Sequence, residues 1–338
     1  MGNVGNERNK GQELLRVSNL KTYFHTFEGL GKAVDGVDFE VGKGGALGIV
    51  GESGCGKSVT ALSILRLIQP PGRIESGEIR FGGVDLLRIS GSEMREVRGN
   101  KISMIFQEPM TSLNPVFTVG NQIAEAVILH QMVSRKDAWQ KSIEMLRLVQ
   151  ISEPQIRALE HPHKLSGGMR QRAMIAMALS CHPELLIADE PTTALDVTIQ
   201  AQILDLMLKL KEEMGTAIIL ITHNLGLIAE VAEKVIVMYT GKIVEQAPVE
   251  DLFEHPRHPY TEGLLQSIPW IGKKMVTKGK PLQEIPGLVP SLFDLPKGCS
   301  FAPRCSHTRP ICQEEEPGLV EFAPGHKVRC WLLAGGIG

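Results

Sequence analysis

Short apolar runs without a polar face recur along this chain. Each is bounded by glycines, polar residues or an amphipathic segment. Apolar runs of this length are typical of strands covered on both faces, as in a parallel α/β sheet. The runs that we interpret in this way span residues 185–188, 217–221 and 234–239, and the short apolar run at 46–50 predicts a further strand.

Further strands and helices follow from the remaining pattern. Residues 59–68 have helical spacing and end before a Pro-Pro-Gly sequence, and residues 110–165 are mostly helical and polar. Alternation of apolar and polar side chains, or a short apolar run, predicts strands at residues 15–20, 33–41, 76–81 and 101–106. One helix face carries an apolar stripe that we interpret as core, formed by Ile199, Ile203, Leu206, Met207, Leu210 and Met214.

The pattern changes near residue 245, where prolines become frequent and long periodic segments end. We therefore predict a disordered tail over residues 1–12, a main domain over 13–250 with a helical subdomain at about 110–170, and an extension over 251–338. The extension has few apolar residues, so a small core cannot hold it together unaided.

Charge and hydropathy exclude several classes of protein. The 338 residues carry a formal net charge of −2 with acidic and basic side chains interspersed, unlike the basic stripe of a nucleic-acid-binding protein. The apolar runs are too short to span a bilayer, and the polar N-terminus has no signal-peptide core. We expect a soluble, cytoplasmic protein whose membrane role comes from a partner.

Residues 51–58 read Gly-Glu-Ser-Gly-Cys-Gly-Lys-Ser between a predicted strand and a predicted helix. The glycines let the backbone wrap closely around an anion, so main-chain N–H groups point at phosphates. Lys57 adds a positive charge for the β- and γ-phosphates, and Ser58 offers a hydroxyl to Mg²⁺. The predicted nucleotide contacts are Gly51, Ser53, Gly54, Cys55, Gly56, Lys57, Ser58 and Val59.

Other predicted strands end in side chains suited to phosphate hydrolysis. Asp189 would hold Mg²⁺, and Glu190 would orient and polarise the attacking water as general base. Gln107 can reach Mg²⁺ and this water from the side. His223 ends another apolar strand and is suited to contact the γ-phosphate and to fix the geometry of Glu190 and the water.

Residues 165–172 read Leu-Ser-Gly-Gly-Met-Arg-Gln-Arg and open a predicted helix. Ser166, Gly167 and Gly168 therefore form a second helix N-terminus that favours an anion.

In this order, the motifs resemble those of the nucleotide-binding subunit of ATP-binding-cassette (ABC) transporters. The resemblance covers about residues 13–250 and implies a P-loop ATPase fold, with a parallel-sheet core, an antiparallel β subdomain and a helical subdomain. In the signature, Met169 stands where many relatives carry Gln. The matching motifs are Walker A (residues 51–58), Walker B (Asp189 and Glu190), the signature (166–171), the Q-loop (Gln107), the D-loop (Asp196), the switch histidine (His223) and the adenine-stacking aromatic (Phe24, with Tyr23 as competitor).

The resemblance also implies a dimeric ATPase. In the family, the signature of one subunit caps ATP bound to a facing subunit. Two ATP molecules hold two subunits together, and hydrolysis releases them. Asp196 lies where a facing copy is contacted.

The extension resembles the oligopeptide/dipeptide branch of this family. The matching stretches are residues 107–115, 258–261, 286–290 and 298–305. The branch implies import of di- or oligopeptides, with an extracytoplasmic binding protein and two transmembrane permease subunits. A short permease helix would dock around Gln107 and the following helices, and the facing ATPase is either a different chain or a second copy. Nickel and glutathione importers share these features, so the substrate stays open.

Four cysteines crowd the extension as Cys299-x5-Cys305-x6-Cys312-x17-Cys330. Four thiolates can bind a four-iron four-sulfur ([4Fe–4S]) cluster or a structural zinc, although the tight Cys pair of most zinc sites is missing. Members of the peptide-importer branch with this tail can carry the iron–sulfur cluster. We expect this cluster to staple the extension, with zinc or metal-free thiols as alternatives.

Three other functions compete with peptide import. A soluble ABC ATPase acting on nucleic acid or ribosomes typically has two cassettes, a coiled-coil insertion or a basic surface, and this chain has none of them. A redox-reading regulatory ATPase would use the cluster as its sensor. The tail argues against an exporter subunit.

Overall fold

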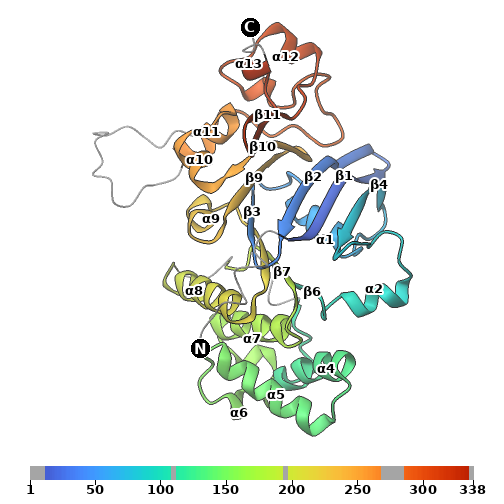
Figure 1. The fold of residues 1–338 in the computed structure, drawn as a ribbon, viewed down its shortest axis with the longest axis vertical. Coiled ribbons are helices and arrows are strands. Elements are labelled where there is room, and N and C mark those ends of the chain that lie inside the picture. The colour runs from blue at the N-terminus through green and yellow to red at the C-terminus, as the bar shows by residue number, and fades with distance from the viewer. Residues whose placement is uncertain (1–11, 108–111, 193–196, 268–284, 335–338) are drawn as a thin grey trace. The chain divides into compact units, whose positions relative to one another are not determined.

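The computed structural model describes residues 12–107, 112–192, 197–267 and 285–334. The chain divides into two compact units. The first unit comprises residues 1–15, 41–46 and 80–221, and the second comprises residues 16–40, 47–79 and 222–338. Figure 1 shows the elements along the chain. The expected disordered tail over residues 1–12 lies almost wholly outside the described residues.

Three parallel strands form the sheet of the first unit. They are β6 (Ile102–Ile105), β7 (Leu185–Asp189) and β8 (Ala217–Ile221), in the order β8-β7-β6. Every residue of β7 and β8 is buried. Continuous burial explains why these strands lack polar alternation, and it confirms the interpretation of the apolar runs.

Helices make up most of the remaining first unit. Helices α4 (Val119–Gln131), α5 (Arg135–Leu148) and α7 (Gly167–Leu179) pack against one another, and Figure 1 shows them side by side. Ala124, Val127 and Ala138 form one core cluster there. The smaller elements of this unit are β5 (Val84–Asp85), α2 (Gly91–Val97), α6 (Pro154–Arg157) and the 3₁₀ turn η2 (Pro162–Lys164).

Helix α8 (Val197–Met214) carries the predicted apolar stripe. The stripe residues Ile203, Leu206, Met207 and Leu210 are buried, which confirms that this face belongs to the core. Ile199 and Met214 lie at the two ends of the stripe and are half-buried.

The second unit contains an antiparallel sheet and part of a mixed sheet. In the first, β2 (Gly29–Gly42), β1 (Glu13–Thr26) and β4 (Gly72–Phe81) follow one another. In the second, the order is β11-β12-β10-β9-β3, where β3 (Ala46–Val50) runs parallel to β9 (Lys234–Tyr239) and β10 (Lys242–Pro248) runs antiparallel to β9.

Helix α1 (Lys57–Ile64) follows β3 directly and is shorter than the sequence predicted. The expectation that it reaches residue 68 was wrong. Arg66 adopts a φ of 52°, in the left-handed region, and the N–H of Leu67 returns to the carbonyl of Leu62 at 2.8 Å. This turn ends the helix before the two prolines that seemed to stop it.

The C-terminal extension is built from short elements that join the mixed sheet. Strand β12 (His326–Val328) pairs antiparallel with β10, and β11 (Val320–Ala323) pairs with β12. The extension therefore adds to a sheet formed by earlier parts of the chain. The helices from residue 225 onward are α9 (Leu225–Val231), α10 (Val249–Glu254), α11 (Pro259–Gln266), η3 (Ala302–Arg304), α12 (Pro310–Glu314) and α13 (Trp331–Ala334).

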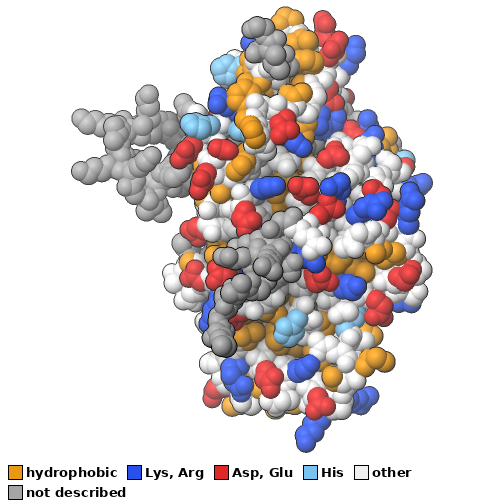
Figure 2. Space-filling view, viewed as in Figure 1, with side chains coloured by type: hydrophobic (Ala, Val, Ile, Leu, Met, Phe, Trp, Pro, Cys, Tyr) orange, Lys and Arg blue, Asp and Glu red, His pale blue; other side chains and the backbone are white. Residues whose placement is uncertain are grey.

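Two surface properties bear on function. Within the described ranges, no helix is both long and apolar enough to cross a bilayer. On the face seen in Figure 2, basic and acidic side chains are interspersed, so the described residues of that face form no broad basic patch.

Candidate ATP-binding and hydrolysis sites

The phosphate loop, residues 51–58, connects β3 to α1 in the second unit. Gly51 has a φ of 153° and Gly56 a φ of 101°. A Cβ atom would lie 2.3 Å from the carbonyl oxygen of Met238 at Gly51 and 2.1 Å from that of Ala33 at Gly56. Only glycine fits these two positions, so neighbouring backbone fixes the path of the loop.

Lys57 lies inside this loop. Its side chain is buried, and Nζ donates to the carbonyl oxygens of Gly51 at 2.8 Å and Glu52 at 3.0 Å. Ser53 and Gly54 are exposed at the tip, while Ser58 and Val59 are half-buried in the first turn of α1. A helix N-terminus, a buried ammonium and accessible loop N–H groups make a cradle for phosphate oxygens.

Cys55 has a structural place in the loop. Its side chain is buried, and this burial raises the pKa of the thiol. The thiol therefore stays protonated and packs as a small apolar group.

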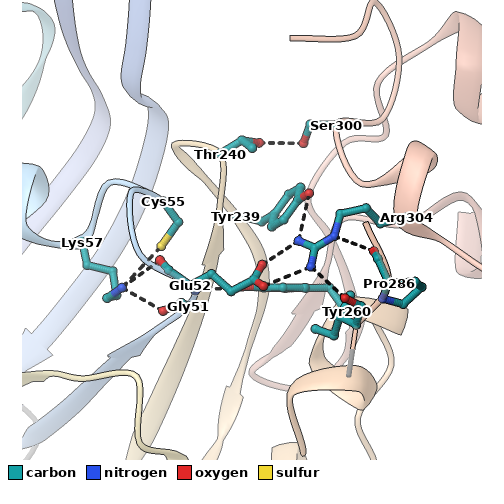
Figure 3. A network of polar contacts seen from close by, with 11 residues as sticks. Gly51, Glu52, Cys55, Lys57, Tyr239, Thr240, Tyr260, Pro286, Ser300 and Arg304 are labelled. Carbon is teal, nitrogen blue, oxygen red and sulfur yellow. Dashed lines mark hydrogen bonds and ion pairs between the residues drawn. The ribbon is translucent and has the colours of Figure 1, made fainter. Parts of the chain in front are cut away.

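The extension contacts the phosphate loop at Glu52, as Figure 3 shows. The Glu52 N–H donates to the Tyr260 hydroxyl at 2.9 Å. The Arg304 guanidinium donates to both oxygens of the Glu52 carboxylate, at 2.6 and 3.0 Å. These hydrogen bonds raise the pKa of Arg304, which keeps the guanidinium charged. Neither Arg304 nor Glu52 was among the residues singled out from the sequence.

The predicted hydrolytic residues Gln107, Asp189 and Glu190 lie in the first unit. Asp189 is the last residue of β7 and is 3% exposed, and Glu190 follows it with a φ of 46°. The Glu190 N–H donates to the carbonyl of Ile221 at 2.8 Å, while Gln107 Nε2 donates to Glu190 Oε2 at 3.2 Å. The structure therefore brings the Gln107 and Glu190 side chains into contact.

His223 lies in the second unit, in the turn between β8 and α9. Its side chain is exposed. The turn is fixed on both sides, because the Thr222 hydroxyl accepts from the N–H of Asn224 at 3.0 Å and the Asn224 side chain accepts from Gly226 at 2.9 Å. These two hydrogen bonds therefore fix the backbone turn that carries the His223 imidazole.

The signature residues open helix α7 in the first unit. Ser166 is the N-cap and accepts from the N–H of Met169 at 3.3 Å. Ser166 and Gly167 are exposed and Gly168 is half-buried, so this helix start can receive an anion from outside the unit. Farther along the helix, Gln171 donates to the carbonyl of Pro191, next to the hydrolytic residues.

Of the two aromatic candidates for adenine stacking, Tyr23 already has a polar partner. Its hydroxyl donates to the Asp35 carboxylate at 2.6 Å, and burial beside that carboxylate raises its pKa. Phe24 is half-buried, with its ring over Gly72. Asp196, the predicted D-loop residue, lies outside the described residues.

The four cysteines of the extension are all described. The Cys299 N–H donates to the carbonyl of Cys312 at 2.8 Å. Burial, with smaller contributions from the charges of Cys299, Cys305 and Cys312, raises the pKa of Cys330 to about 11. The thiols are therefore near one another. Across the described ranges, however, no three His, Cys, Asp or Glu side chains converge on a single metal-ion position.

Comparisons with known proteins identify the family. Residues 34–193 match the ABC transporter family, and residues 244–312 match the oligopeptide/dipeptide transporter C-terminal region. The chain belongs to the ATP-binding proteins of ABC transporters, in the oligopeptide/dipeptide group. It is 58% identical to the probable peptide ABC transporter ATP-binding protein y4tR of Sinorhizobium fredii, over 95% of this chain and 96% of the relative. It is 52% identical to the oligopeptide transport ATP-binding protein AppD of Bacillus subtilis, over 94% and 96% of the two chains.

A solved structure supports the fold of this ATPase. The ATP-binding cassette MJ0796, a dimer in a post-hydrolysis state bound to ADP and Pi, matches with a TM-score of 0.64 and 26% identity. The match covers 70% of the present chain and 99% of MJ0796. The expected P-loop ATPase fold is therefore confirmed, and the family match confirms ATP hydrolysis as its activity.

Proposed function

We propose that this ATPase powers the import of di- and oligopeptides through a membrane permease. The observation that carries the proposal is the combination of the phosphate loop and the Gln107–Glu190 pair with a C-terminal region found in peptide transporters. Relatives at 52–58% identity over nearly the whole chain carry peptide-transport names. Peptide is favoured over nickel or glutathione on this basis.

In the proposed reaction, the phosphate loop binds the triphosphate through its N–H groups and Lys57. Glu190 accepts a proton from the attacking water, which Gln107 and His223 orient toward the γ-phosphorus. Phe24 stacks on adenine, because Lys32 Nζ already lies over the Tyr23 ring, 5.9 Å from its centroid. The phosphate loop thus acts in ATP binding, and Glu190 acts in cleavage of the phosphate bond.

Magnesium fits the donor set of the proposed site. Ser58, Asp189 and the carbonyl oxygen of Gln107 are the hard oxygen ligands that Mg²⁺ prefers, and the Gln107 amide already uses its nitrogen on Glu190. When bound, Mg²⁺ neutralises the charge that develops on the phosphates. The proposed cofactors are therefore ATP and Mg²⁺.

We assign the exposed signature start to a facing ATPase subunit. Ser166, Gly167 and Gly168 would cap ATP bound to that subunit, and Asp196 would contact it. The facing subunit is a different chain or a second copy. The dimeric state of MJ0796 with ADP and Pi supports this arrangement by similarity.

The permease would dock on the helical part of the first unit. Four large apolar side chains are exposed just before α4 and near its C-terminal end, where a permease helix would bury them. They are Val116 at 71%, Phe117 at 52%, Leu129 at 70% and Met132 at 96%. Docking here would hold the ATPase at the cytoplasmic face of the membrane, under two permease subunits that receive peptide from an extracytoplasmic binding protein.

The four extension thiols would hold a [4Fe–4S] cluster. Each thiolate of such a cluster binds a different iron, so the four sulfurs need not converge on one point. A single zinc ion, with Zn–S bonds of about 2.3 Å, would require that convergence. Cys299, Cys305, Cys312 and Cys330 are close enough to influence one another's charge. The cluster would staple the extension rather than take part in ATP hydrolysis.

Reconstitution into proteoliposomes tests the proposed function. The chain is combined with the permease, the facing ATPase and the binding protein, and uptake of labelled di- and tripeptides is measured. We expect ATP-dependent peptide uptake, abolished by Glu190→Gln. Uptake of nickel or glutathione but not of peptides would show that the proposed substrate is wrong. Absence of ATP-dependent uptake of any solute would overturn the transport role.

A further inference from the structure

Parts of the extension that ATP chemistry does not use converge on one residue of the phosphate loop. Arg304 donates to Glu52 and, through Nε, to the carbonyl of Pro286 at 3.0 Å. A second guanidinium nitrogen lies 3.3 Å from the carbonyl of Ile285. With Tyr260 on the Glu52 N–H, the three extension stretches 258–261, 285–290 and 298–305 meet at the loop (Figure 3).

The Arg304–Glu52 ion pair is largely shielded from water. The Arg304 side chain is 3% exposed and the Glu52 side chain 30%. The guanidinium lies 5.9 Å above the Tyr239 ring, which packs on Tyr260 at 4.7 Å and on Phe301 at 5.3 Å between ring centroids. A two-pronged pair held by aromatic rings and carbonyls has a fixed geometry, unlike a mobile surface pair.

Glu52 is a junction between the extension and the phosphate-binding lysine. Its carboxylate accepts from Arg304, its N–H donates to Tyr260, and its carbonyl accepts from Lys57 at 3.0 Å. The orientation of this one residue therefore links the extension to the ammonium group that meets the phosphates. Its carboxylate is also a negative charge within a loop that binds an anion, so a neutralising partner favours nucleotide binding.

We propose that Arg304 is a positioning residue for ATP binding. It fixes the phosphate loop through Glu52 and cancels the charge of that carboxylate, so the extension helps to form the nucleotide site. This inference rests on the proposed role of the loop in binding phosphates. Arg304 itself does not touch the nucleotide.

A double-mutant cycle in the full chain tests the proposal, with ATP affinity measured by calorimetry. Arg304→Met leaves the Glu52 charge beside the phosphates, and we expect the dissociation constant to rise roughly tenfold or more, equivalent to about 1.4 kcal/mol. Glu52→Gln changes it by less than about threefold. In the double variant, Glu52→Gln restores affinity to within about threefold of the starting chain, because no unpaired carboxylate is left.

Arg329→Met is the matched control. Arg329 also belongs to the extension and donates to the carbonyls of Ile243 and Pro317, but it does not contact the phosphate loop. It should leave ATP affinity unchanged. Equal weakening by Arg304→Met and Arg329→Met, or absence of rescue by Glu52→Gln, would overturn the positioning role.

Two further variants keep the test decisive. If Arg304→Met does not fold, Arg304→Lys retains the charge but loses the two-pronged geometry, and we expect a loss of about threefold; unchanged affinity contradicts the proposal. Lys57→Ala distinguishes failure of the positioning role of Arg304 from failure of the phosphate-loop assignment. If Lys57→Ala weakens binding and the Arg304 variants do not, the positioning role fails and the phosphate loop stands. Unchanged affinity in Lys57→Ala removes the loop assignment itself.

Discussion

The phosphate loop and the proposed hydrolytic pair, Gln107 and Glu190, are held by different kinds of contact. The loop is fixed by backbone contacts at Gly51 and Gly56, by a buried Lys57 and by two side chains of the extension. In the other unit, Gln107 is exposed and Glu190 is half-buried, and one side-chain hydrogen bond of 3.2 Å joins them. A cradle that is already fixed lowers the entropic cost of binding ATP. The Gln107–Glu190 pair instead depends on a contact between two side chains at strand ends, which a single substitution can remove.

The strongest test of this contrast is Glu190→Gln. Loss of the general base should lower the rate of ATP hydrolysis by about 10²–10⁴-fold, or roughly 3–5 kcal/mol in the barrier, while ATP binding is retained and the closed dimer is trapped. Phosphate release and size-exclusion chromatography measure the two effects. Glu184→Gln, an exposed carboxylate just before β7, is the control. Near-normal turnover in Glu190→Gln would remove Glu190 from the base role.

The anchoring of the extension can be tested at Glu245. This carboxylate is fully buried and accepts from the N–H groups of Arg257 at 2.8 Å and His258 at 3.0 Å, with His326 Nε2 at 2.7 Å. Glu245→Ala leaves all three buried donors without this acceptor, so the free energy of unfolding should fall by about 3–5 kcal/mol. Urea unfolding measures the loss, with the exposed Glu254→Ala as reference. Equal stability of the two variants contradicts this anchor.

Lys57→Ala tests the cradle directly. Removing an ammonium that binds phosphate oxygens should weaken ATP binding by about 1.5–3 kcal/mol, or roughly 10- to 150-fold in the dissociation constant. Titration calorimetry provides the comparison with Lys234→Ala, an exposed lysine at the start of β9 in the same unit. An unchanged dissociation constant would count against the loop as the phosphate site.

The smallest effect on ATP hydrolysis is expected at the cysteines. Protein purified without oxygen should contain about four irons and four sulfides per chain, and Cys305→Ser should lose them with less than about a threefold change in turnover. Iron, sulfide and zinc analysis with an absorption spectrum measures the content, and Cys181→Ser is the control. One zinc per chain would show that zinc, rather than the cluster, holds the extension together. A large fall in the ATP turnover of Cys305→Ser would indicate a regulatory role.

The parts of this molecule that could be predicted from sequence are those encoded locally. The strands β7 and β8 were identified because burial on both faces leaves a continuous apolar run, and the stripe on α8 because burial of one face leaves a helical period. The phosphate loop and the strand-end residues were found because glycine, lysine and carboxylate spacing reflects their chemistry.

The contacts of Arg304 could not be predicted in the same way. Arg304 and Glu52 are 252 positions apart, and neither residue type at its position signals the other. Residues 258–261 and 298–305 were noted as family features, but their meeting point depends on how the extension packs. The antiparallel pairing of β12 with β10 likewise joins two segments that are far apart in the sequence, so no local pattern predicts it.

The buried thiol of Cys55 has a consequence for chemical damage. Electrophiles and peroxides attack the thiolate, and burial keeps this group both protonated and shielded. A cysteine in a nucleotide loop would otherwise make the enzyme vulnerable to alkylation. Here the loop gains a close-fitting side chain without that weakness, so oxidative loss of ATPase activity should begin elsewhere in the chain.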